Sequence, residues 1–189
     1  MSGRSTPSQT VGPFYSIGFS WLERADLTQG VDEGIRITIE GRLLDGDNRP
    51  VPDAVLEIWQ ADANGLYTHT VNEPELLAPN KFWGFGRVPV NDNGEFCFAT
   101  IKPGSVREAD GTQQAPHLQV SIFMRGLLRR LVTRIYFPLE PLNHSDLVLS
   151  CVPAPRRHTL VATEDGGNQK KLRWDVHLQG EPETVFFDC

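Results

Sequence analysis

The chain has 189 residues and a mass of 21.1 kDa, a length typical of one domain whose hydrophobic core needs no metal or disulfide staples. A formal net charge of −6, from 18 Lys and Arg against 24 Asp and Glu, argues against a general nucleic-acid binder. No apolar run approaches the roughly 20 residues that span a bilayer, and residues 1–10 lack the apolar core of a secretory signal.

The cysteine count indicates the redox environment of the protein, and the Gly and Pro content indicates its fold class. The three cysteines, Cys97, Cys151 and Cys189, are an odd number, far apart and without C-x-x-C spacing, which predicts a reduced, cytoplasmic protein. The 17 Gly and 14 Pro amount to about one residue in six, against an average of roughly one in eight. Such a density interrupts helices and favours short strands joined by turns.

Alternation of apolar and polar residues dominates the chain from residue 35 onward. In segment 35–43 the odd positions are apolar or Gly and the even ones are polar, which is typical of a half-buried strand. We predict strands over 35–43, 55–60, 95–101, 118–124, 131–137, 159–163, 172–178 and 184–187, with short helical turns over 20–25 and 145–151. The pattern predicts an all-β fold: a β-sandwich of about eight to nine mostly antiparallel strands with long loops and little helix.

Three segments, 1–34, 66–90 and 102–116, read as long connections with few apolar residues. In a compact domain such loops usually carry function or bury themselves against a partner. The first of them divides the chain into an N-terminal arm, residues 1–34, and a β-sandwich domain, residues 35–189.

The arm has an unusual composition for a terminal segment. Gly12 and Pro13 leave backbone exposed and fix one φ angle. Four aromatic side chains follow: Phe14, Tyr15, Phe19 and Trp21. Such an arm either packs on its own domain or grips another chain.

Metal ligands and nucleophiles give weak signals. The five histidines form no H-x-H or H-x-x-x-H pair, so no ready-made pair of ligands stands on one strand or helix. A scattered set, His69, Glu73, Glu75 and His117, could converge in space, although scattered residues of these types are more often surface or hydrogen-bonded groups. Cys97, between Phe96 and Phe98 in a predicted strand, suggests packing rather than reactivity.

Arginine gives a stronger signal. Arg125, Arg129, Arg130 and Arg134 form a basic cluster in an acidic chain. Arg suits bidentate capture of a carboxylate, and a solvated strand face is the equally weighted alternative. In a strand over 131–137, Arg134 lies on the face opposite the apolar side chains at odd positions.

Six sequence blocks together resemble the intradiol ring-cleavage dioxygenases, and most closely the alpha chains of heteromeric members. The blocks lie in order along nearly the whole chain, at residues 6–14, 57–67, 98–104, 115–117, 133–137 and 179–188. The resemblance implies a β-sandwich core and a reaction in which non-haem Fe(III) and O2 open a catechol between its two hydroxylated carbons. For the substrate protocatechuate, the product implied is 3-carboxy-cis,cis-muconate, in the degradation of aromatic compounds.

The resemblance also implies that this chain holds no iron. Iron-binding members use two tyrosines and an H-x-H pair, whose place is taken here by His117 and Gln119. The tyrosine positions fall near Val106 and Glu75. His117 and Gln119 are therefore interpreted as vestigial ligand positions, and Fe(III) is expected on a partner beta subunit in repeated alpha–beta units.

For the substrate, the resemblance implies that the arm and one arginine complete the partner's pocket. Carried over to this sequence, the positions are Thr10, Gly12, Pro13, Phe14 and Arg125. A ring carboxylate needs a cationic wall and a flat ring needs apolar surfaces beside it. Phe14 stands where the family has a tyrosine, which removes one hydroxyl from the pocket.

Two other readings stay open at this point. The first is a transthyretin-like β-sandwich that acts only as a binding module, which would fit residues 41–54 but leaves the blocks at 59–67 and 183–188 unexplained. The second is an autonomous iron dioxygenase, which the missing ligands disfavour.

Overall fold

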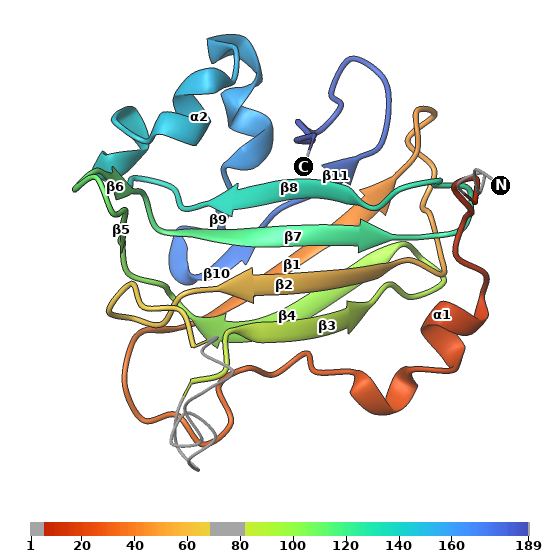
Figure 1. Cartoon of the computed structure of the whole chain (residues 1–189), viewed down its shortest axis with the longest axis horizontal. Helices are drawn as coiled ribbons and strands as arrows, with labels where there is room; N and C mark the ends of the chain where they lie inside the picture. The colour runs from red at the N-terminus through yellow and green to blue at the C-terminus, as the bar shows by residue number, and fades with distance from the viewer. Residues whose placement is uncertain (1–5, 69–81, 189) are drawn as a thin grey trace, which may run out of the picture.

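The computed structural model describes residues 6–68 and 82–188, which form two β-sheets packed face to face (Figure 1). The first sheet contains β1 (Arg36–Leu44), β4 (Glu95–Ile101), β9 (Thr163–Asp165), β10 (Asn168–Arg173) and β11 (Val176–His177). The second has the order β3 (Phe85–Pro89), β2 (Val55–Gln60), β7 (His117–Phe123), β8 (Leu131–Tyr136). A separate ribbon pairs β5 (Val106–Arg107) with β6 (Gln113–Gln114).

The predicted sandwich is confirmed, and among the residues described six of eight strand ladders, the β5–β6 ribbon included, are antiparallel. Inward-facing apolar side chains from both sheets form one core, which includes Ile39 and Phe98 from the first sheet and Ile58 and Ile122 from the second. Two strand ladders are parallel rather than antiparallel: those of β1 with β10 and of β1 with β11. They bring segments from opposite ends of the sequence together.

Helical segments are few and short, as predicted. In the part of the chain that the structure describes, they are α1 (Phe14–Ile17), η1 (Ser20–Leu22), η3 (Pro141–His144), α2 (Leu147–Cys151) and η4 (Ala154–Leu160), where η marks a 3-10 helix. Among the residues described, no helix has the length and apolar character needed to cross a membrane.

Two strand predictions were wrong, and several strands were missed. The segment 159–163 starts as the end of η4, whose Pro-containing start favours a helical turn, and only Thr163 belongs to a strand, β9. The segment 184–187 is no strand, although Phe187 makes an isolated bridge to Val132. β3 was missed because it lies inside the segment 66–90, and the ribbon β5–β6 was missed inside 102–116.

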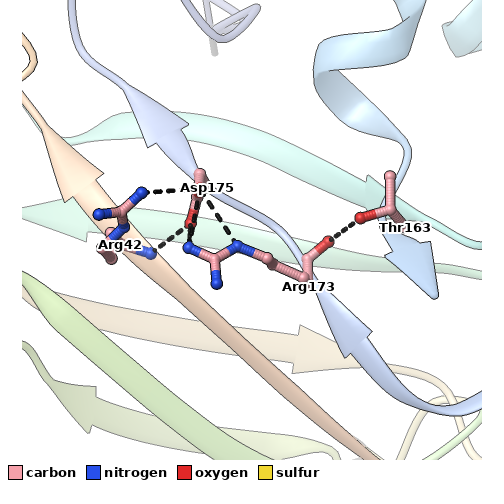
Figure 2. A network of polar contacts seen from close by, with 4 residues as sticks. All are labelled: Arg42, Thr163, Arg173 and Asp175. Atoms are coloured by element: carbon pink, nitrogen blue, oxygen red, sulfur yellow. Dashed lines mark hydrogen bonds and ion pairs between the residues drawn. The ribbon is translucent and has the colours of Figure 1, made fainter. Parts of the chain in front are cut away.

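The predicted strand 172–178 is broken in two where Trp174 crosses Gly41 of β1. A Cβ on Gly41 would lie 1.9 Å from the Trp174 carbonyl oxygen, so only glycine permits this crossing. Beyond the break, a carboxylate oxygen of Asp175 accepts a hydrogen bond from the Arg42 backbone N–H at 2.9 Å. Figure 2 shows this carboxylate between the Arg42 and Arg173 side chains. A side chain thus supplies the backbone partner that the broken ladder lacks.

Cys97 corrects another expectation. Phe96 and Phe98 are buried in the core, but the Cys97 side chain lies on the opposite face of β4 and is exposed. The alternation of side chains along β4 was predicted correctly, but the Cys97 thiol faces solvent and not the core.

The outer face of β8 is covered by α2 and η4. This face is therefore not the solvated strand face that the sequence left open as an alternative. Tyr136 of β8 is fully buried in a second apolar cluster with Leu149 and Leu160. Asp146, the N-cap of α2, is fully buried beneath this layer. Its carboxylate accepts hydrogen bonds from Leu149 N–H (2.8 Å), Ala115 N–H (2.8 Å) and Tyr136 O–H (3.0 Å), and so joins the helical layer to the sheet.

Replacing Asp146 by Ala should lower the free energy of unfolding by about 3–5 kcal/mol, because three buried donors lose their acceptor. Asp146→Asn keeps one acceptor oxygen and should cost clearly less. Urea unfolding of the purified chain measures both. The exposed Asp92→Ala is the matched control, expected within about 0.5 kcal/mol of the parent. Equal losses for Asp146→Ala and Asp92→Ala would contradict the role assigned to Asp146.

Candidate functional site

The N-terminal arm crosses the outer face of the second sheet and turns one aromatic side chain inward. Tyr15 packs against Phe123 of β7, with ring centroids 5.1 Å apart. Farther along the arm, Leu27 and Val31 are buried as well. Around α1 and η1, by contrast, Phe14 is 77% exposed and Trp21 is 75% exposed, beside exposed Ile17 and Leu22. The arm therefore packs on its own domain and also presents an apolar surface of the kind that partners cover.

A charged pair lies beneath Tyr15. Arg87 of β3 and Glu57 of β2 face each other in register, and the Arg87 side chain is only 6% exposed. Glu57 Oε1 accepts hydrogen bonds from Arg87 Nη1 at 2.5 Å and from the Tyr15 hydroxyl at 3.2 Å. The Arg87 guanidinium also lies 4.5 Å from the Tyr15 ring centroid, a cation–π distance.

The predicted pocket residues of the arm meet the arginine turn at one edge of the sandwich. The Gly126 N–H donates a hydrogen bond to Thr10 Oγ1 at 2.8 Å, between positions 116 apart in the sequence. Gly126 has φ +93°, which favours glycine. The structure thus joins Thr10 of the arm to the turn that contains Arg125. Gly12 and Pro13 follow Thr10 in the chain, and Phe14 opens α1.

Arg125 is held loosely. Its side chain is 63% exposed and its guanidinium lies 3.4 Å from the Asp53 carboxylate, itself 43% exposed. Ion pairs this exposed contribute little to stability, so the guanidinium can turn toward another carboxylate at small cost. Arg129 and Arg130 are exposed in the same turn.

Arg134 has a different environment from the rest of the arginine cluster. It is half-buried on the outer face of β8, donates a hydrogen bond to Gln114 Oε1 at 2.7 Å and lies 3.4 Å from the Tyr136 hydroxyl. Gln114 in turn donates to Glu108. Arg134 therefore fastens the β5–β6 ribbon to the sheet, and the cluster is not one carboxylate-binding patch.

His117 and Gln119, which the family resemblance predicts to be vestigial ligand positions, lie on the same outer face of β7. Gln119 is directly between Trp59 and Arg134 in the strand register. His117 is buried, at 2% exposure. Its Nδ1 lies 2.8 Å from the Ala115 carbonyl oxygen, which can only accept, so Nδ1 carries the proton. Its Nε2 then accepts from the Tyr67 hydroxyl at 3.5 Å.

The electrostatics of this region disfavour a metal ion. Burial, with the nearby Arg134 cation second, lowers the pKa of His117 to about 4. Burial also raises the pKa of Tyr67, so Tyr67 stays a neutral phenol. Ferric iron prefers an anionic tyrosinate and imidazole nitrogens that are free to coordinate. Here the Tyr67 phenol instead donates a hydrogen bond to the His117 imidazole, and the Arg134 guanidinium lies beside Gln119 in the strand register.

Fe(III), which the fold family implies, does not fit these residues. The His117 ring is committed at both nitrogens, Gln119 supplies an amide, and the cation of Arg134 stands opposite Gln119. Within 6–68 and 82–188, no group of three or more His, Cys, Asp or Glu side chains is placed to hold a metal. Three members of the scattered set, His69, Glu73 and Glu75, lie outside the described residues.

Sequence reasoning missed Arg87 and Glu57. A signal was available: Glu57 stands at an outward position of a predicted strand, and a charged residue there needs a partner if a loop covers it. The partner, Arg87, lies in β3, within the segment 66–90 that the sequence pattern predicted to be a long connection. The pairing of Glu57 with Arg87 could therefore not be predicted from the sequence.

Comparison with known proteins identifies the class. A family model described as "Dioxygenase" matches residues 11–180. The chain therefore belongs to the dioxygenase family, and the resemblance to intradiol ring-cleavage enzymes is confirmed. A solved dioxygenase domain from Streptomyces sp. SirexAA-E shares the fold, with a TM-score of 0.62, 22% identity and coverage of 95% of this chain and 96% of that one.

Two curated relatives sharpen this assignment. The protocatechuate 3,4-dioxygenase alpha chain of Pseudomonas putida is 39% identical, over 97% of this chain and 96% of its own length. The protocatechuate 3,4-dioxygenase beta chain of Burkholderia cepacia is 31% identical, over 86% of this chain and 72% of its own. The chain is thus an intradiol dioxygenase subunit, which disfavours the transthyretin-like alternative, and its near-full-length similarity is to the alpha type.

The low pKa of His117 predicts a pH-dependent stability. Below pH 6.5 the unfolded chain takes up a proton at this position, whereas the folded chain does not until about pH 4. The free energy of unfolding should therefore fall across that window as the pH decreases, by on the order of 3 kcal/mol in total. Urea unfolding at several pH values should show a shallower dependence for His117→Gln and an unchanged one for the exposed His144→Gln. Parallel curves for His117→Gln and the parent would contradict the assignment.

Proposed function

We propose that this chain is the alpha, non-iron-binding subunit of a protocatechuate 3,4-dioxygenase. The enzyme would use Fe(III) on a beta subunit and O2 to cleave protocatechuate to 3-carboxy-cis,cis-muconate. The alpha chain contributes part of the substrate pocket and an assembly surface, and it is inactive alone. The similarity to an alpha chain of that name over 97% of this chain is the basis of the proposal.

One structural observation carries the pocket assignment: the hydrogen bond between Gly126 N–H and Thr10 Oγ1. It joins the arm and the arginine turn into a single edge, so Thr10, Gly12, Pro13, Phe14 and Arg125 can face one ligand. The edge offers one mobile guanidinium for a carboxylate. It also offers an exposed aromatic ring beside a rigid Gly-Pro backbone.

The misfit of iron to this chain supports its placement on a partner. His117 and Gln119 then remain as structural residues behind Arg134, with no role in the chemistry. The exposed apolar side chains of the arm, Phe14, Ile17 and Trp21, are the surface that we assign to contact with the iron-bearing beta subunit.

Replacing Arg125 by Ala in the alpha–beta complex should raise KM for protocatechuate about 5- to 20-fold, because the ring carboxylate loses a charge-assisted partner. Plain catechol has no carboxylate, so its KM should change by less than about twofold. Steady-state O2 uptake measures both. Arg129→Ala, in the same turn, is the matched control. An equal effect of Arg125→Ala on both substrates would remove Arg125 from carboxylate recognition.

Colour tests the location of the iron. Purified alone and incubated with Fe(III), the chain should stay colourless and take up no O2 with protocatechuate, because a ferric–tyrosinate chromophore needs ligands that it lacks. Co-expressed with a beta chain bearing two tyrosines and H-x-H, it should co-purify as a red-brown, active complex. A coloured, active alpha chain alone would overturn the proposal, as would failure of the two chains to associate.

A further inference from the structure

The part of the arm that contains α1 and η1 has little to hold it in place by itself. α1 has only four residues, with no side-chain hydrogen bond at its N-cap and no buried residue. η1, which follows, has three residues and none buried. Helices this short are unstable in isolation, so the position of the arm must be fixed by contacts with the sheet.

For residues 15–24, several of those contacts converge on Arg87, whereas Leu27 and Val31 are anchored separately in an apolar cluster. Its Nη2 donates to the Tyr15 backbone carbonyl at 2.8 Å, and its Nη1 lies 3.4 Å from the Tyr15 hydroxyl. Its guanidinium lies 4.5 Å from the Tyr15 ring centroid and 5.7 Å from that of Phe19. The Arg87 side chain therefore contacts the backbone carbonyl, the hydroxyl and the aromatic ring of Tyr15.

The backbone of Arg87 holds the other end of the same segment. Its carbonyl accepts from Arg24 N–H at 2.8 Å, and its N–H donates to the Arg24 carbonyl at 3.2 Å. The chain between Tyr15 and Arg24 is thus fastened at both ends to one position of β3. Glu57, 25% exposed, supplies the negative charge that keeps the covered guanidinium paired.

We propose that Arg87 is a positioning residue that fixes the arm and, through it, the strip Thr10–Phe14. Tyr15 directly follows that strip, and its N–H donates to the Gly12 carbonyl at 3.0 Å. Fixing Tyr15 therefore fixes the backbone that precedes it. The effect on the substrate pocket rests on the proposed function, whereas the fastening of the arm does not.

Lysine cannot replace Arg87 in this role. Its ammonium is a single point of charge, whereas the guanidinium is a planar fork that bonds Glu57 and the Tyr15 carbonyl from separate nitrogens while stacking on the ring. Arg87→Lys keeps the charge opposite Glu57 and tests the geometry alone. Tyr15→Ala tests the same contact from the arm and leaves the sheet intact.

The experiment is hydrogen–deuterium exchange and steady-state kinetics on the full chain in complex with its beta subunit. In both Arg87→Lys and Tyr15→Ala, exchange at the amides of residues 15–18 should speed up about tenfold or more. KM for protocatechuate should rise about fivefold, with kcat within about twofold of the parent. Arg157→Lys is the matched control, because Arg157 also donates to backbone carbonyls, of Ser150 and Val152, away from the arm.

The outcomes separate the two proposals. Unchanged arm exchange in both Arg87→Lys and Tyr15→Ala would overturn the positioning role, whatever the kinetics. Faster exchange with an unchanged KM would support the positioning role and count against the arm as a pocket wall. Faster exchange together with a higher KM supports both.

Discussion

The structure depends on covering the outer face of the β3–β2–β7–β8 sheet, because that face carries two arginines that cannot be left unpaired under a layer of protein. Residues paired across neighbouring strands form two adjacent rows on this face. One row contains Arg87 and Glu57, and the next contains Trp59, Gln119 and Arg134. The arm covers the first row, and the β5–β6 ribbon is fastened over the second through Gln114. Each covering segment has few buried residues near the arginine that it covers, and the hydrogen bonds of Arg87 and Arg134 help to hold it there.

The same sheet face carries the two positions that the family resemblance links to iron and supports the arm that we assign to the pocket. The Arg134 cation lies near His117, and the Tyr67 phenol and the His117 imidazole are neutral and bonded to each other. The same sheet face supports, one row away, the arm that bears Thr10 and Phe14. The misfit of iron to the row of Gln119 and Arg134 is therefore compatible with the binding role that we propose for the arm one row away.

Sequence patterns predicted much of the fold, because period-two alternation is a direct consequence of burying one face of a strand. The strands containing Ile39, Ile58 and Ile122 followed from it. The strand at Phe85–Pro89 did not, because Gly86 and a buried Arg87 interrupt the alternation. The meeting of Thr10 with Gly126 was reachable only through family resemblance, since no local pattern links positions 116 apart. Pairing of Arg87 with Glu57 needed the sheet order itself.

The parallel pairing of β1 has a consequence for how the chain folds during synthesis. Thr38 is paired with Lys171 and Leu43 with Val176, so one edge of β1 stays open until nearly the whole chain has left the ribosome. β4 closes the other edge much earlier, through pairs such as Ile39 with Phe98. Contacts this distant in sequence slow folding, and an open strand edge invites pairing with other chains. Truncation at the C-terminus would thus harm solubility more than the small size of β10 and β11 suggests.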